Sequence, residues 1–184
     1  LESHGRRAGD LHIFQGVSVI VGNGADDVEN QYHTTAALVS IHDALNYLGR
    51  YFEHHDFSQY PLDAPFPDIG DLGKNSFRST TDEIKRNARE RNLTLRQVAL
   101  EAASPRPRFS GTPEQVADGL QAWFEEKAAD GFIIQGGTPD TFPRFVDQVV
   151  PVLQARGLFR TDYPGTTLRE SLGLDEPKNQ FTQQ

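Results

Sequence analysis

Blocks of apolar residues along this chain predict strands separated by amphipathic helices. The first block, Leu11–Val21, is apolar and β-branched, which is typical of a buried strand, and Gly16 is expected to break it. Apolar residues then recur at helical spacing and predict one helix over 28–49. Two shorter helices are predicted over 81–92 and 94–103, so the first half of the chain holds one strand and several helices.

Past its midpoint the chain has the pattern of a strand, a helix and a second strand. After a short strand at 108–111, Thr112 is placed to cap a helix, with Pro113 at the first helical position and Gln115 completing a capping box. The run FIIQ at 132–135 is typical of a buried strand in a parallel sheet. The helix between the two strands is expected to bury Val116, Leu120, Trp123 and Phe124.

Capping residues also mark other helix ends. Thr80 or Thr81 is predicted to cap the helix over 81–92, and Thr94 with Gln97 matches a capping box for the next one. These signals support two separate helices in this part of the chain.

A last helix is predicted to open at Thr138, to kink at Pro151 and to end at Gly157. Its expected buried face consists of Phe142, Phe145, Val146, Val149, Val150 and Leu153. We interpret residues 1–157 as one domain, and residues 158–184 as a polar C-terminal tail without a strand signal. The region at about 52–80 begins with a stretch rich in proline, glycine and aromatic residues that has no period, which predicts an irregular insertion.

Strands that alternate with helices imply an α/β fold with a parallel sheet. A closed (β/α)8 barrel has eight strands and typically about 250 residues. This chain has three convincing strands in 184 residues. An open sheet of three strands would leave two edges uncovered. The pattern therefore predicts part of a TIM barrel.

Composition and charge exclude several functions. A net charge of −8 argues against a nucleic-acid partner, because phosphate binding needs a basic face. The chain has no cysteine, which excludes disulfides, thiolate metal sites and cysteine nucleophiles. No apolar run approaches the length of a membrane span, so no membrane association is predicted.

Candidate ligand side chains are densest at 53–56, where Glu53, His54, His55 and Asp56 follow one another. Adjacent histidines point in different directions and no third ligand follows at a spacing typical of zinc, so a solvated loop is favoured and no metal site is predicted. The glycines Gly131, Gly136 and Gly137 do not form a dinucleotide fingerprint, and turn glycines are the commoner explanation.

The chain nevertheless resembles the bacterial-luciferase-like flavin monooxygenases, specifically the branch of nitrilotriacetate monooxygenase component A, the pristinamycin synthase subunit and the dibenzothiophene sulfone monooxygenase. The matching strings cover most of the chain in the family's order. They are GVSVIVG (16–22), DFSQYPLDAPFP (56–67), LTLRQVA (93–99), SGTPEQVADGLQAWFEEKAADGF (110–132) and FVDQVVPVLQARGLFRTDYPGTTLRESLGL (145–174).

The resemblance implies the C-terminal portion of a TIM barrel, about strands six to eight plus an insertion. It places Leu11–Gln15 at the sixth strand, 108–110 at the seventh and 132–135 at the eighth. Members of this family are usually more than twice as long, and the main flavin contacts are expected upstream of Leu1. This chain alone is therefore expected to be inactive.

The function that the resemblance implies is a cytoplasmic, homo-oligomeric monooxygenase of the two-component type. Reduced FMN would come from a separate NAD(P)H:flavin reductase, and O2 would oxidise a small organic substrate. One alternative is a deazaflavin-dependent oxidoreductase of the same superfamily, which would differ mainly in contacts upstream of Leu1. Another is a truncated, non-catalytic module that keeps only an assembly surface, because the tail mixes Phe159 and Tyr163 with Arg156 and Arg160, as interfaces do.

No residue of this chain is predicted to be catalytic, because in such enzymes the flavin and O2 carry the difficult step. Barrel sites lie at the carboxyl ends of strands. We therefore expect the substrate pocket to be lined here by Phe14, Gln15, Ser110, Gln135 and Gly136. The irregular segment 57–67 is a candidate lid.

Overall fold

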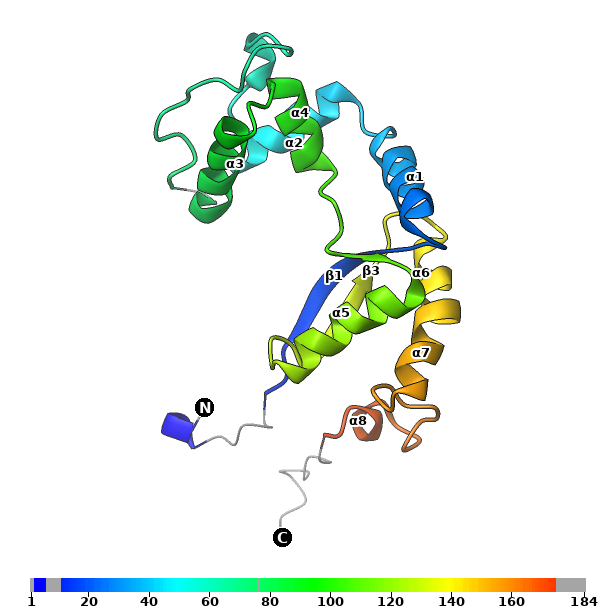
Figure 1. The fold of residues 1–184 in the computed structure, drawn as a ribbon. Helices are drawn as coiled ribbons and strands as arrows, with labels where there is room; N and C mark the ends of the chain where they lie inside the picture. The colour runs from blue at the N-terminus through cyan, green and yellow to red at the C-terminus, as the bar shows by residue number, and fades with distance from the viewer. Residues whose placement is uncertain (1, 6–10, 76, 175–184) are drawn as a thin grey trace.

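Two groups of apolar side chains form separate cores in this chain, one beside a parallel sheet and one among helices. Figure 1 shows the ribbon of the sheet apart from that of the helical group. The structure is a computed structural model that describes residues 2–5, 11–75 and 77–174. The elements in chain order are η1 (Glu2–His4), β1 (Phe14–Val21), α1 (Ala25–Ala36), α2 (Ile41–Tyr51), η3 (Phe57–Gln59), α3 (Arg78–Glu90), α4 (Leu95–Ala103), β2 (Phe109–Gly111), α5 (Pro113–Glu125), β3 (Gly131–Gln135), α6 (Thr141–Arg144), the π-helical η4 (Phe145–Val149), α7 (Val150–Ala155) and α8 (Leu168–Ser171).

The sheet has three parallel strands in the order β2-β1-β3, which confirms the predicted α/β class. The first five residues of β1 pair with β3, from Phe14 opposite Gly131 onwards, and its last three pair with β2, from Val19 opposite Phe109 onwards. In a barrel each strand pairs with its neighbours in sequence. The observed order differs from this, because β1 lies in the centre.

The first strand lies further along the chain than predicted. β1 spans Phe14–Val21 instead of starting at Leu11, and Gly16 continues it instead of breaking it. Gly16 is paired opposite Ile133, and a Cβ at Gly16 would lie 3.1 Å from the Nε2 atom of Gln135. The space beside Gly16 is therefore limited by the end of the Gln135 side chain, and the strand continues through this glycine without a turn.

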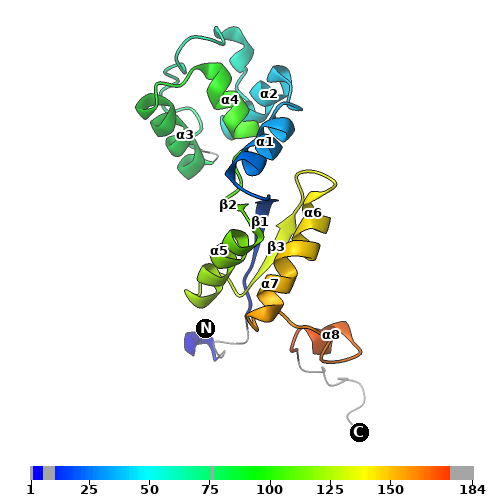
Figure 2. The same cartoon turned by 45° about the vertical axis from the view of Figure 1, so that its right-hand side comes forward.

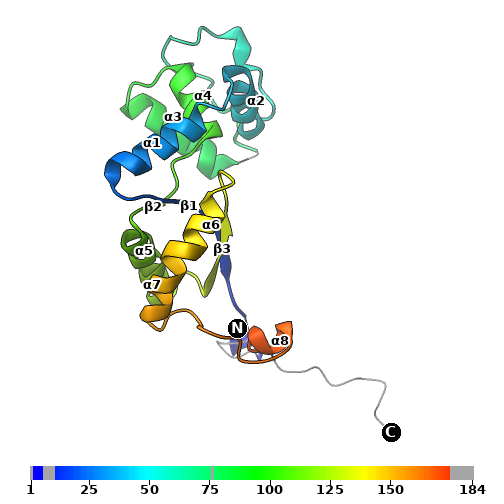
Figure 3. The same ribbon diagram turned by 90° about the vertical axis from the view of Figure 1, so that its right-hand side faces the viewer.

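Helices cover one face of the sheet, and Figure 3 shows α5 and α7 on the same side of β1 and β3. Thr112 caps α5 in a capping box with Gln115, and Pro113 occupies its first turn, as predicted. The covered face of β1 carries Val17, Val19 and Val21. These three valines form one core with Phe109, Val116, Ala117, Leu120, Phe145 and Val149.

The other face of the sheet carries no helix of the sheet core. On it, Phe14 is 51% exposed and Ile133 is 57% exposed, so the prediction of a fully buried strand at 132–135 is wrong for this chain. The apolar run misled because Phe132 and Ile134 pack on the core while Ile133, between them, points the other way.

Some residues predicted to lie on the buried faces of the helices are exposed in the structure. Phe124, Phe142 and Val146 are exposed, although each was expected to be buried. The last helix contains the π-helical turn η4 directly before Pro151, which reorients the residues that follow Phe142. It ends where predicted, with Gly157 at a φ of 69°.

One helix was predicted over 28–49, but the structure has two, α1 and α2. The break lies at 37–40, where Ser40 caps α2 by accepting a hydrogen bond from the Asp43 backbone N–H at 3.1 Å. Leu38 is 80% exposed, so its apolar character reflects no burial. The helical spacing continued by chance across a capped break.

Residues 40–103, which we call the helical module, have a core of their own. Thr94 and Gln97 form the predicted capping box of α4. The cap predicted at Thr80 or Thr81 is wrong, because α3 already begins at Arg78 and Thr81 is fully buried within it. The buried core consists of Ala44, Leu45, Leu48, Phe52, Phe57, Ala88, Leu93, Leu95, Val98 and Ala99.

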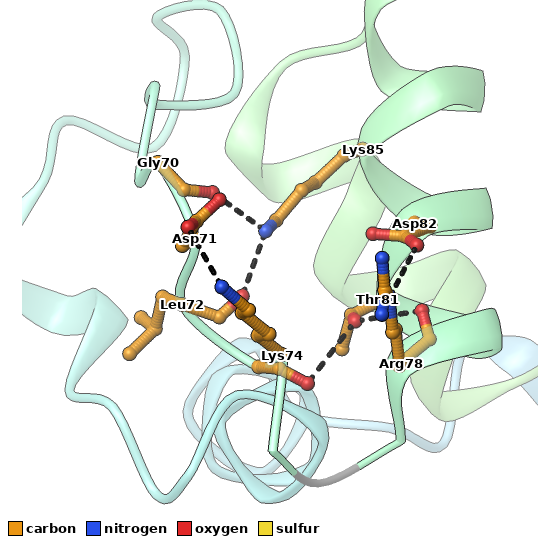
Figure 4. A network of polar contacts seen from close by, with 9 residues as sticks. Gly70, Asp71, Leu72, Lys74, Arg78, Thr81, Asp82 and Lys85 are labelled. Atoms are coloured by element: carbon orange, nitrogen blue, oxygen red, sulfur yellow. Dashed lines mark hydrogen bonds and ion pairs between the residues drawn. The ribbon is translucent and has the colours of Figure 1, made fainter.

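Polar contacts tie the irregular segment of this module to α3 (Figure 4). The Lys85 ammonium donates hydrogen bonds to the carbonyls of Gly70 at 2.8 Å and Leu72 at 2.7 Å. It also lies 5.6 Å from the ring centroid of Phe52. A hydroxyl hydrogen bond from Thr81 to the Gly73 carbonyl, at 3.4 Å, adds a second tie.

Replacing Lys85 by methionine should loosen this segment. The change keeps a long apolar stem but leaves two carbonyls without their charged donor, which should cost about 1–2 kcal/mol of unfolding free energy. Amide hydrogen exchange in residues 66–74 should accelerate accordingly. The control is Lys74→Met, which removes only an exposed ion pair to Asp71 at 3.4 Å and should have little effect. Equal exchange in both variants would contradict the assignment.

Beyond Gly157 the described part of the tail holds α8, which begins with a capping box between Thr167 and Glu170. Leu1 and residues 175–184 lie outside the described residues. No helix in the described ranges is long and apolar enough to cross a membrane.

Candidate functional site

A cleft of about 520 Å³ lies where the carboxyl ends of β1 and β3 face α1. In Figure 2 the loop after β3 reaches towards α1. Ligands of parallel α/β sheets bind at this end of the strands. The lining residues are Ser18, Val19, Ile20, Asn30, Gln31, Tyr32, Thr34, Thr35, Val39, Ala103, Ser104, Pro105, Pro107, Gly137, Thr138, Asp140, Thr141 and Arg144.

Helix α1 forms one wall of the cleft and is fixed at two points. The Gln31 side-chain amide donates to the Val21 carbonyl at 3.1 Å, which joins the helix to β1. The Tyr32 hydroxyl donates to the Ser104 carbonyl at 3.0 Å, which joins it to the segment before β2.

Arg106 adds further contacts between α1 and the segment before β2. Its guanidinium lies 4.4 Å from the ring centroid of Tyr32 and pairs with both carboxylate oxygens of Glu29 at 2.8 Å. The hydrogen bond from Arg106 is the main cause that lowers the pKa of Glu29. This wall is therefore held by charged contacts on the side away from the cleft opening.

The opposite wall is the segment from Gly137 to Arg144. The Thr138 backbone N–H donates to the Thr141 hydroxyl at 3.2 Å, and the two threonine hydroxyls lie 3.0 Å apart. These bonds close the loop that follows β3 and start α6. Arg144, at the end of α6, is the one cationic residue that lines the cleft among the described residues.

The carboxylate of Asp27 interacts electrostatically with Arg144. Its pKa is lowered, first by a hydrogen bond from the Asn23 backbone N–H at 2.9 Å, then by the Gln31 side chain, and also by the charge of Arg144. Asp27 and Arg144 do not form an ion pair. Asp27 therefore stays ionised at neutral pH, and its Oδ2 accepts a hydrogen bond from the backbone of Asn23, in the turn before α1.

The structure does not gather the five predicted pocket residues at this cleft. Phe14 and Gln15 lie at the start of β1, the opposite end from the cleft, because the strand is shifted from its predicted position. Ser110 lines a separate shallow hollow beside α5. Gln135 and Gly136 precede Gly137 in the loop and do not themselves line the cleft. Their role in binding a substrate stays a prediction.

The sequence offered little to single out the residues that do line it. Gln31, Thr34 and Thr35 recur at helical spacing, which places them on one face of α1, but this face was assigned to a longer helix. Arg144 is a lone arginine one turn into a helix, and no motif marks it.

No protein-family model matches the chain. N-acetyl-S-(2-succino)cysteine monooxygenase from Bacillus subtilis (strain 168) is 37% identical over 180 residues, covering 96% of this chain and 41% of the relative. Nitrilotriacetate monooxygenase component A from Aminobacter aminovorans is 38% identical over 182 residues, covering 97% and 40%. The solved structure of EDTA monooxygenase from Chelativorans sp. BNC1 matches with a TM-score of 0.59 at 31% identity, covering 95% of this chain and 41% of that one.

The fold is thus an α/β fold with a small parallel sheet, and its structural neighbours are luciferase-like monooxygenases of the TIM-barrel family. By sequence, the chain is a homologue of the luciferase-like, flavin-dependent monooxygenases in the branch of nitrilotriacetate monooxygenase component A. The resemblance read from the five sequence strings is confirmed. The chain spans about two fifths of the length of these relatives.

The described lining residues do not enclose a flavin. Tyr32 is the one aromatic residue among them, and one face of its ring is covered by Arg106. Ser18, on the floor of the cleft, is exposed on the helix-free face of the sheet. The donors suit a charged or hydroxylated group, but an isoalloxazine ring would lack apolar walls on both sides. We therefore assign no reaction step to a flavin held by these residues.

Proposed function

We propose that this chain forms the C-terminal part of a monooxygenase that uses reduced FMN and O2 to oxidise a small organic substrate. The observation that carries the proposal is identity of 37–38% with two such monooxygenases over nearly the whole chain. FMN would be reduced by a separate NAD(P)H:flavin reductase. The chain alone would be inactive, because its cleft forms one side of a site.

The proposal includes the position of the chain within a barrel. In a barrel, helices cover the outer face of the sheet and the inner face looks into the lumen. Among the described residues, the helices that pack on the sheet lie on one face, which supports about strands six to eight of such a barrel, with the insertion at about 52–80 inside the helical module. The order β2-β1-β3 means that β2 would have to move between β1 and β3 when the barrel closes.

The substrate does not carry over from the relatives. Their names specify N-acetyl-S-(2-succino)cysteine, nitrilotriacetate and dibenzothiophene sulfone, which share no single group. We keep Gln135 and Gly136 as proposed pocket residues, because they directly precede Gly137, which lines the cleft. A homo-oligomeric assembly is likewise part of the proposal.

Co-expression tests this function. The chain should form a stable complex with the N-terminal barrel half of nitrilotriacetate monooxygenase component A, supplying the first five strands. The complex should bind FMN and, with a flavin reductase, NADH and O2, should hydroxylate a substrate. Val19→Asp, which places a charge in the sheet core, is the control that should abolish assembly. A complex that assembles but neither binds flavin nor consumes O2 beyond the reductase background would refute the proposal.

A further inference from the structure

We propose that Arg144 and the polar face of α1 form a subsite for a carboxylate group of the substrate. This inference rests on the proposed function, and it narrows the substrate class to small organic acids. Three features of the cleft support it: an arginine without a hydrogen-bond or ion-pair partner among the described residues, two polar side chains without side-chain hydrogen bonds among the same residues, and a position at the carboxyl ends of the strands.

The first feature is the state of Arg144. Among the described residues its guanidinium has no hydrogen-bond or ion-pair partner, while its backbone N–H is used by the Asp140 carbonyl at 3.0 Å. Arg86 and Arg89 on α3 are likewise without a side-chain hydrogen bond or ion pair among the described residues, whereas several other arginines are paired. Arg91 makes two bonds to Glu101 at 2.8 and 2.9 Å, and Arg96 makes two to Asp63 at 2.8 and 3.1 Å. A cation is thus left free in a chain that carries 26 acidic residues and 18 basic ones.

The second feature is on the facing wall. Asn30 and Thr34 lie one turn apart on α1, line the same cleft, and have no side-chain hydrogen bond among the described residues. Their neighbours Gln31 and Thr35 are already used, by the carbonyls of Val21 and of Gln31 itself. The wall therefore offers one amide and one hydroxyl opposite a guanidinium.

These donors match a carboxylate better than a neutral ligand. A guanidinium binds a carboxylate through two parallel N–H bonds, and such charge-assisted bonds are about twice as strong as neutral ones. Asn30 and Thr34 could donate to a second carboxylate or hydroxyl on the same molecule. Asp140 lines the cleft and Asp27 interacts electrostatically with Arg144, so these two carboxylates weaken the binding of any acid and the attraction of Arg144 has to exceed their repulsion.

The same donors would also suit the phosphate of a flavin, so the experiment must separate the two sources. Titration calorimetry of the chain uses tricarballylate as the anionic probe and its neutral triamide as the matched probe. The variants are Arg144→Gln and Arg144→Lys. Arg86→Gln is the charge-matched control, because Arg86 is exposed on α3 and lies outside the cleft.

Tricarballylate should bind saturably to the unchanged chain and to Arg86→Gln. Arg144→Gln should weaken it about tenfold or more, with Arg144→Lys in between, and the triamide should bind about tenfold more weakly than the acid. Thr34→Val, a change at an exposed position, should weaken tricarballylate binding about threefold. This variant replaces Arg144→Gln as the test if Arg144→Gln does not give a native circular dichroism spectrum.

Absence of saturable binding, or equal binding by Arg144→Gln, would overturn the inference. The inference would also be overturned if Arg144→Gln weakened the binding of FMN but left the binding of riboflavin and of tricarballylate unchanged. The arginine would then bind the flavin phosphate. Flavin binding by the co-expressed complex is measured on the same variants. Intact flavin binding with lost tricarballylate binding in Arg144→Gln is the expected result, whereas a complex without flavin binding counts against the proposed function alone.

Discussion

Replacing Leu48 by alanine should lower the free energy of unfolding of the helical module by about 2–5 kcal/mol and leave the sheet folded. Leu48 is fully buried in the core of that module. None of the residues in this core belongs to the core of the sheet, so a cavity in one removes no contact from the other. Trp123, the single tryptophan, packs against the sheet core and reports on it by fluorescence.

Urea denaturation followed by both Trp123 fluorescence and circular dichroism would check this. The dichroism transition, which includes the helices of the module, should move to lower urea while the fluorescence transition stays. The matched control is Leu38→Ala, a change at an exposed leucine that should alter stability by less than about 0.5 kcal/mol. If the two signals shift together, the two cores unfold as one cooperative unit and their separation is wrong.

Two neighbouring isoleucines of β3 should respond in opposite ways to the same substitution. Ile134→Lys should destabilise the sheet by about 2–3 kcal/mol, because its side chain packs against the core under α5. Ile133→Lys should change stability by less than about 0.5 kcal/mol, because Ile133 is exposed on the helix-free face. Thermal unfolding followed by Trp123 fluorescence measures both.

Ile133→Lys should also reduce the binding of a hydrophobic dye and the self-association of the chain. The helix-free face exposes Phe14 and Ile133 together, and apolar surface of this kind is uncommon on a free monomer. Lysine at that position breaks the surface without touching the core. Destabilisation of equal size in both variants would mean that both faces are covered, and the barrel-sector proposal would lose its main structural support.

Local signals predicted the helix starts best, because a capping box depends on residues only three apart. Thr94 and Thr112 cap α4 and α5 as their sequences indicate. The break at Ser40 was not predicted, although Ser40 caps α2 with Asp43. Apolar residues at helical spacing lie on both sides of this cap, and they indicated one continuous helix. The fold class followed from alternation, but the central position of β1 depends on pairing between distant segments, which no local pattern encodes.

The candidate site was predicted less well than the fold, for a reason that lies in β1. Placing the strand at Leu11 put Phe14 and Gln15 near its carboxyl end, whereas they begin the strand in the structure. A shift of a few residues along a strand moves a side chain from one end of the sheet to the other. Arg144 could not be found from the sequence, because its significance lies in what surrounds it in space and not in its neighbours along the chain.

The split pairing of β1 has a consequence for biosynthesis. β1 leaves the ribosome before both of its partner strands, which follow only after the helical module, whose contacts are far more local. Chains fold from the N-terminus as they emerge, and distant pairings form slowly. The module should therefore fold while Val17 has not yet paired with β3, and Val19 and Val21 have not yet paired with β2. During that interval, the nascent strand is the segment on which a chaperone would act or from which aggregation would start.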